Sequence, residues 1–88
     1  MTRVRVRIRG RVQGVFFRAE AQARAESLGV AGWIRNADDW SVEAVFEGDD
    51  EQLESMVEWC RRGPAGARVD EVEVGREEPA GEIGFQFR

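Results

Sequence analysis

The chain has 88 residues, a length that suits one small domain, because two domains of half this size could not each bury a stable core. Hydrophobic residues make up 42% and charged residues 34%, which is typical of a globular protein and not of a disordered or fibrous one. The net charge of −4 argues against a general nucleic-acid binder, and a single cysteine without any histidine excludes an internal disulfide and a thiolate–imidazole zinc site.

The first predicted element is a strand over residues 3–9, where arginine alternates strictly with an aliphatic residue. We expect Val4, Val6 and Ile8 to face the core. The four arginines of the other face suggest nucleic-acid binding, but no stacking aromatic residue accompanies them in the pattern. We therefore favour pairing with acidic residues of neighbouring strands, chosen from Glu43, Glu47, Glu71 and Glu73.

A loop with two glycines over residues 10–14 interrupts this pattern and precedes a predicted helix. Apolar residues spaced by four, four and three positions form one face of that helix: Phe17, Ala21, Ala25 and Leu28. Gly29 is expected to end it. Residues 31–36 predict a second strand and residues 41–47 a third, and the two form a hairpin around a polar loop.

Asp49 is the predicted N-cap of a second helix, since Gln52 follows three residues later. Its buried stripe is Leu53, Met56, Val57 and Cys60, and Gly63-Pro64 ends it. Residues 69–74 predict a fourth strand, and Ile83, Phe85 and Phe87 alternate in a short fifth one. This order predicts an α+β fold in which residues 1–88 form a single domain: a ferredoxin-like βαββαβ sandwich, with a mostly antiparallel sheet and both helices on one face.

The junction between the first strand and the first helix is suited to binding an anion. Glycines at 10 and 14 allow successive N–H groups to turn inward, and a helix N-terminus carries a partial positive charge. Arg18 follows within the first turn and supplies a guanidinium with several donors. From spacing alone, an ordinary strand–helix turn with a solvent-facing arginine explains the segment equally well.

The run Gly10-Arg11-Val12-Gln13-Gly14-Val15-Phe16-Phe17-Arg18 resembles the signature loop of the acylphosphatase family, small enzymes of ferredoxin-like fold. A second signature of the family resembles Gly32-Trp33-Ile34-Arg35-Asn36 with Ser41-Val42-Glu43 and Gly48, and the similarity continues from Trp59 to Pro64 and into the fourth strand. Two positions depart from the family pattern: Trp40 stands where a glycine is usual, and Ala37 where threonine or leucine is frequent.

The resemblance implies that Arg18 binds the phosphate of an acyl phosphate and that Asn36 orients the attacking water. It also implies that main-chain N–H groups of the loop line the phosphate cradle, at Val12, Gln13, Gly14 and Val15. The composition fits this chemistry, because a chain without histidine, lysine or tyrosine lacks most general acids and bases. An acyl phosphate expels a carboxylate of pKa roughly 4 to 5, so the leaving group needs no proton.

The sequence therefore predicts a metal-independent acylphosphatase without a cofactor, acting on small acyl phosphates, with inorganic phosphate as product and inhibitor. The alternative is a catalytically slow or silent module of the same family that binds an anion or a partner protein, since related domains occur inside larger carbamoyl-transferring proteins. We expect a monomer that binds neither nucleic acid nor membrane. The N-terminus lacks the apolar segment of a signal peptide, which favours the cytoplasm.

Overall fold

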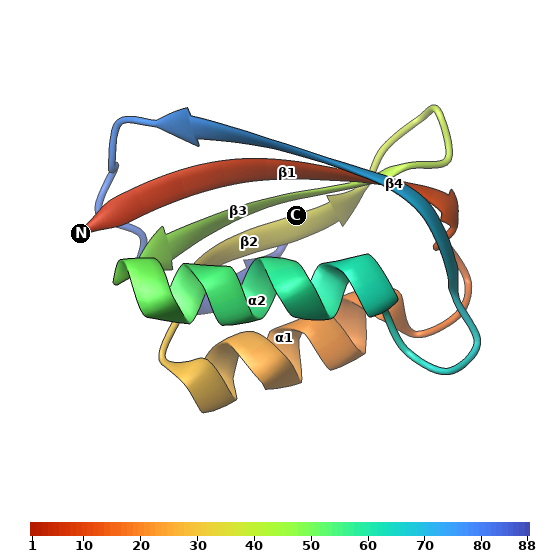
Figure 1. The fold of residues 1–88 in the computed structure, drawn as a ribbon, viewed down its shortest axis with the longest axis horizontal. Coiled ribbons are helices and arrows are strands. Elements are labelled where there is room, and N and C mark those ends of the chain that lie inside the picture. The colour runs from red at the N-terminus through yellow and green to blue at the C-terminus, as the bar shows by residue number, and fades with distance from the viewer.

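The five strands of the chain form one sheet, and a computed structural model describes all 88 residues (Figure 1). The strands are β1 (Thr2–Arg11), β2 (Ala31–Asn36), β3 (Val42–Gly48), β4 (Arg68–Glu77) and β5 (Phe85–Phe87). The helices α1 (Phe17–Leu28) and α2 (Asp50–Arg62) lie side by side on one face of the sheet. The predicted ferredoxin-like α+β sandwich is confirmed.

The order of strands across the sheet is β4-β1-β3-β2-β5. β1 pairs antiparallel with β3 and β4, and β2 pairs antiparallel with β3, whereas β5 lies parallel to β2. Because of this parallel pairing, Phe87 lies opposite Ile34, two residues before the end of β2 at Asn36. The C-terminus of the chain therefore lies at the same end of the sheet as the loop that connects β1 to α1.

The core lies between the helices and the sheet and contains 17 buried residues. Val4, Val6 and Ile8 face it, as their alternation predicts. Phe17 of α1 contacts Trp59 of α2 edge to face, with ring centroids 5.3 Å apart. Cys60 is fully buried in this core, and burial raises the pKa of its thiol to about 12, so it is unreactive at neutral pH.

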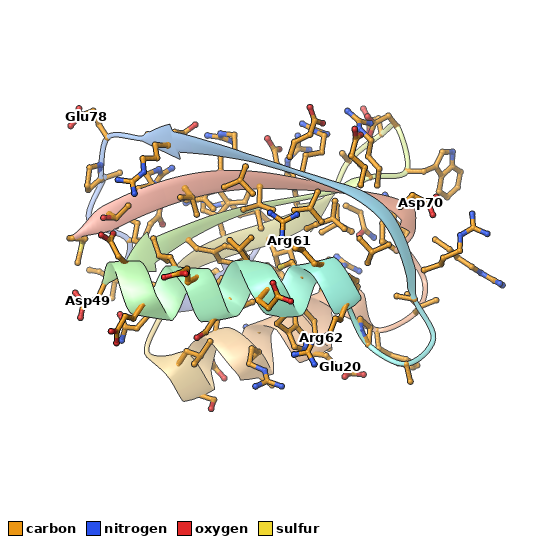
Figure 2. All side chains as sticks on the ribbon, viewed as in Figure 1. Glu20, Asp49, Arg61, Arg62, Asp70 and Glu78 are labelled. Atoms are coloured by element: carbon orange, nitrogen blue, oxygen red, sulfur yellow. The ribbon has the colours of Figure 1, made fainter.

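Both helices begin and end at the predicted residues. Gly29 has φ 75° and donates its N–H to the carbonyl oxygen of Glu26, which closes α1. At the start of α2 the N–H of Asp49 donates to Oε1 of Gln52 at 2.8 Å, and Arg61 and Arg62 occupy the last turn (Figure 2). Neither helix is long and apolar enough to cross a membrane.

Several strand boundaries differ from the prediction, and β4 runs from Arg68 to Glu77 although it was expected to end at residue 74. β1 continues through Gly10, at which a break was expected, because the register with β4 shifts there and the two backbones approach closely. A Cβ at residue 10 would lie 2.2 Å from the carbonyl oxygen of Arg68, and φ is 134°, so only glycine fits. Ile83 was expected in the last strand, but it precedes β5 and is 87% exposed.

Four of the five arginines of β1 pair with acidic side chains across the open face of the sheet, as predicted for Arg3, Arg5, Arg7 and Arg9. Arg3 contacts Glu47 at 2.8 Å and also Glu77 and Glu82, each at 3.0 Å. Arg5 shares Glu77 with Arg3 and also pairs with Glu43. Arg7 pairs with Glu43 and Asp39, and Arg9 pairs with Asp39, Glu71 and Glu73.

One aromatic residue does lie on the same face of the sheet as these arginines. Trp33 of β2 lies on the same face, because the register places it two strands from Arg5. The guanidinium carbons of Arg5 and Arg88 lie 5.5 and 5.0 Å from the centre of its ring. The indole is 6% exposed, so it offers no free surface on which a base could stack.

Candidate active site

A hollow of about 330 Å³ lies at the edge of the sheet where β1 leads into α1 and where β2 and β5 end. Arg18 and Asn36 both line it, although they belong to different elements. The remaining lining residues are Val12, Gly14, Phe16, Phe17, Ala19 and Phe87. The fold thus brings together the two side chains that the family resemblance assigns to the site, along with two of the four loop residues.

Two residues of the loop before α1 adopt a positive φ. Gly14 has φ 74° with open space beside its Cα, and Phe16 adopts the left-handed conformation at φ 62°, ψ 21°. No side chain caps the N-terminus of α1, so its first N–H groups have no side-chain acceptor. Free N–H groups and the positive end of the helix dipole therefore both lie at this end of α1.

Arg18 is bound to an aromatic ring and not to an acid. Its guanidinium carbon lies 5.1 Å from the centre of the Phe87 ring. It takes part in none of the ion pairs of the chain, which engage Arg3, Arg5, Arg7 and Arg9 of β1 together with Arg35, Arg68 and Arg88. The positive charge of Arg18 is therefore held in place without being neutralised.

Gln13 and Val15 are the two expected loop residues that do not line the hollow. The side-chain amide of Gln13 donates to the carbonyl oxygens of Ala37 and Ser41, each at 2.9 Å. It thereby connects the loop before α1 to the hairpin that follows Asn36. Val15 packs against the core. Only a main-chain role was predicted for Gln13, because the sequence does not show which backbone carbonyls its side chain reaches.

The hairpin between β2 and β3 is closed by a hydrogen bond from the N–H of Ala37 to the carbonyl oxygen of Ser41, at 2.8 Å. Trp40 has φ 72° within it and is 74% exposed, so it occupies the conformation that usually selects glycine. Asp39 accepts the N–H of Ser41 and pairs with Arg9. Hydrogen bonds from the Ser41 hydroxyl and N–H, and then from Arg9, lower the pKa of Asp39.

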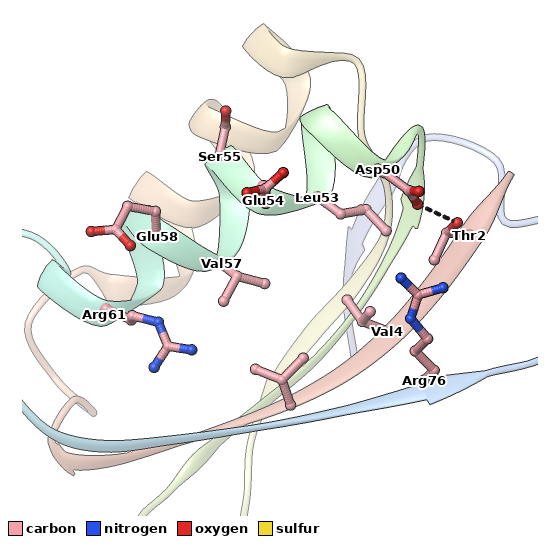
Figure 3. A pocket seen from close by; sticks show the side chains of 11 residues that line it. Thr2, Val4, Asp50, Leu53, Glu54, Ser55, Val57, Glu58, Arg61 and Arg76 are labelled. Atoms are coloured by element: carbon pink, nitrogen blue, oxygen red, sulfur yellow. Dashed lines mark hydrogen bonds between the residues drawn. The ribbon is translucent and has the colours of Figure 1, made fainter.

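A larger hollow of about 790 Å³ lies away from these residues, between α2 and the strands β1 and β4 (Figure 3). Its charged residues carry both signs, with Asp50, Glu54 and Glu58 against Arg61 and Arg76. It therefore has no clear preference for an anion. The structure contains no group of three or more carboxylate or thiolate side chains arranged to hold a metal ion.

The fold and the hollow define a small two-layer α+β protein in which Arg18 and Asn36 lie together at the uncapped N-terminus of α1. Residues 4–87 match the family model for acylphosphatases. The chain is 57% identical over 88 residues to an acylphosphatase of Rubrobacter xylanophilus, covering 98% of this chain and 79% of that protein. It is 53% identical over 87 residues to an acylphosphatase of Haloarcula marismortui, covering 99% of this chain and 96% of that protein.

Solved structures agree with this match. The crystal structure of acylphosphatase from Bacillus subtilis superimposes with a TM-score of 0.96 at 35% identity, covering 100% of this chain and 99% of that one. The structure of T. kodakarensis HypF superimposes with a TM-score of 0.87 at 28% identity, but this chain spans only 12% of it. The chain belongs to the acylphosphatase family, whose members hydrolyse acyl phosphates, and the resemblance seen in the sequence is confirmed.

Proposed function

We propose that the protein hydrolyses small acyl phosphates to a carboxylate and inorganic phosphate without a metal ion. Arg18 and the main-chain N–H groups of residues 12–15 bind the phosphoryl group, and Asn36 orients the attacking water. The observation that carries this proposal is that Arg18, which has no acidic partner, shares one hollow with Asn36 at the uncapped N-terminus of α1. A guanidinium and several amides provide the donors that a transferring phosphoryl group requires.

The reaction needs little chemistry from side chains. The water oxygen attacks phosphorus while the bond from phosphorus to the acyl oxygen breaks, and the electron pair of that bond leaves with the carboxylate. A phosphate oxygen takes the proton of the water. The carboxylate is a weak base with a pKa of roughly 4 to 5, so no general acid is needed. Positioning and charge stabilisation then account for the catalysis.

Asn36 suits the task of holding water because its amide both donates and accepts hydrogen bonds without changing charge. Its backbone is fixed by the pairing of β2 with β3, where residue 36 lies opposite Val42. The bonds from Gln13 to Ala37 and Ser41 connect this position to the phosphate loop. These contacts support a constant distance between the bound phosphate and the water.

The alternative of a slow or silent binding module is kept because a domain of this fold forms 12% of the T. kodakarensis HypF structure. The whole-chain similarity to acylphosphatases favours the enzyme. We further propose that residues 1–88 act as one domain, because a single cluster of 17 buried residues spans the strands and helices. We also propose that the protein is a cytoplasmic monomer that binds neither nucleic acid nor membrane. The ion pairs of the β1 arginines support the absence of nucleic-acid binding, because acidic side chains already neutralise these arginines.

The deciding experiment is the hydrolysis of benzoyl phosphate with and without excess EDTA. We expect equal rates and competitive inhibition by inorganic phosphate, because arginine and amides replace the metal as charge stabilisers. The Arg18→Gln variant, purified in the same way, controls for contaminating phosphatases. A requirement for added magnesium, or a rate unaffected by phosphate, contradicts the proposed mechanism. A folded protein that binds phosphate without hydrolysis supports the binding module.

A further inference from the structure

The hollow beside Arg18 is largely apolar, with five hydrophobic residues among the eight that line it. Val12 and Phe17 are 1% exposed and form its floor as part of the core. Phe16 and Phe87 are different, because they remain 80% and 45% exposed. The aromatic surface next to the proposed phosphate cradle is therefore open to a ligand.

Phe16 is held in a costly conformation. A residue with a Cβ pays about 1 to 2 kcal/mol in the left-handed region, where Phe16 lies at φ 62°. Its exposed ring gains little burial within the fold that would offset this cost. Glycine or asparagine would adopt the same conformation more easily. Local strain of this kind collects at ligand sites, and here it presents an aromatic ring at the wall of the hollow.

Phe87 reaches the hollow from the opposite end of the chain. β5 lies parallel to β2 and places Phe87 opposite Ile34, close to Asn36. The guanidinium of Arg18 lies 5.1 Å from the centre of its ring. The ring thus orients Arg18 and leaves the guanidinium charge available for an anion, while more than two fifths of the Phe87 residue stays exposed.

The volume of the hollow exceeds what a phosphate group fills. Liquid water occupies about 30 Å³ per molecule, so a hollow of about 330 Å³ has the volume of roughly ten waters. A phosphate group has only five non-hydrogen atoms and therefore displaces only some of these waters. The remaining space is bordered by Phe16 and Phe87 and lacks a charged group other than Arg18.

We propose that Phe16 and Phe87 form the acyl subsite, so that among small acyl phosphates the protein prefers those with an aromatic acyl group over those with an acetyl group. This inference rests on the proposed hydrolysis of acyl phosphates. An acyl ring seated between these side chains buries apolar surface and gains aromatic contacts, whereas an acetyl group reaches neither ring fully. Phe16 and Phe87 then determine specificity, while Arg18 and Asn36 serve all acyl phosphates alike.

The test compares kcat/KM for benzoyl phosphate and acetyl phosphate in the wild type, Phe16→Ala and Phe16→Gly. We expect the benzoyl-to-acetyl ratio to fall about fivefold in both variants, which is the size of one aromatic contact. Phe16→Gly also removes the backbone strain, so agreement between the two variants attributes the change to the ring. Trp40→Ala, which removes another exposed aromatic residue outside the hollow, should keep the wild-type ratio.

An unchanged ratio in both Phe16 variants, with both substrates still hydrolysed, overturns the acyl subsite and leaves the proposed function intact. Loss of inhibition by inorganic phosphate in these variants also overturns it, because the ring would then act by shaping the phosphate loop. A folded wild-type protein that hydrolyses neither substrate overturns the proposed function itself.

Discussion

Arginine serves two different purposes in this chain, on the open face of the sheet and at the start of α1. On the sheet, Arg3 is buried among three carboxylates, and the hydrogen bond that it donates to Glu47 raises its pKa against the effect of burial. At the start of α1, Arg18 contacts the ring of Phe87 and no carboxylate. A guanidinium saturated by acids stabilises the fold, whereas one fixed by an aromatic ring keeps its donors for a ligand.

Neutralising Arg18 should have the largest effect of the changes considered. We expect Arg18→Gln to lower kcat/KM for benzoyl phosphate by at least two orders of magnitude, because it removes the only charge of the cradle. Arg18→Lys should recover little, since an ammonium lacks the planar pair of donors. Arg11→Gln is the matched control, because Arg11 is exposed at the end of β1. A larger loss in Arg11→Gln would mean that the roles within the loop are assigned wrongly.

The ion pairs on the open face of the sheet predict that the stability of the fold depends on pH. Burial alone would raise the pKa of Glu47, but hydrogen bonds from the N–H of Ala80, from Arg3 and from the N–H of Glu82 lower it to about 2. Because the pKa of Glu47 is lower in the folded than in the unfolded chain, its carboxylate stabilises the fold. This stabilisation is complete above the unfolded pKa of 4.5 and is lost as the pH falls toward 2. The contribution amounts to up to about 3 kcal/mol.

Urea denaturation between pH 7 and pH 2.5 measures this contribution. Glu47→Gln should be destabilised at pH 7 and should lose less stability than the wild type below pH 4.5. Asp70→Asn is the control, because Asp70 pairs only with Arg68 at an exposed position. If the wild type and Glu47→Gln lost stability in parallel on acidification, the ion pairs of Arg3 would not stabilise the fold.

The Asn36→Ala variant should separate turnover from phosphate binding. We expect kcat to fall about ten- to a hundredfold while inhibition by inorganic phosphate changes less than twofold, because Asn36 holds the water and not the anion. Steady-state kinetics with phosphate as competitor measures both quantities. A folded variant that no longer binds phosphate in calorimetry would place Asn36 in the anion site and leave the water without a positioning group.

Trp40→Gly should have the smallest effect and should stabilise the protein by a few tenths to about 1 kcal/mol. Trp40 lies in the left-handed region at φ 72° and is 74% exposed, so strain outweighs its packing. Trp40→Ala removes the indole but keeps a Cβ, and it should not stabilise the fold. A lower urea midpoint for the glycine variant would show that the indole packs usefully against the hairpin.

The sequence predicts the elements well because their periodicities and end signals are local. The alternation of residues 3–9 suffices to place β1, although not its continuation to Arg11, and the glycine at position 29 suffices to end α1. Features that depend on distant contacts were missed. Glu77 and Glu82 reach Arg3 only because β4 extends beyond its predicted end and the chain then turns back across the face.

The residues of the candidate site also divide into those that the sequence reveals and those that depend on distant contacts. Arg18 and Asn36 follow from a family resemblance along the chain, whereas Phe87 joins them through the parallel pairing of β5 with β2, which no local pattern encodes. Phe16 is exposed at the hollow because of its left-handed backbone just before α1, which no local pattern of the sequence reveals.

The position of the chain ends has a practical consequence for work with this protein. Thr2 pairs with Gly48 at the far end of β1, roughly 30 Å from the loop by the rise of a ten-residue strand. Arg88 instead donates its N–H to Ile34 beside the hollow. A purification tag is therefore best fused before Met1, where it leaves substrate entry free. A fluorophore attached after Arg88 would report directly on occupancy of the hollow.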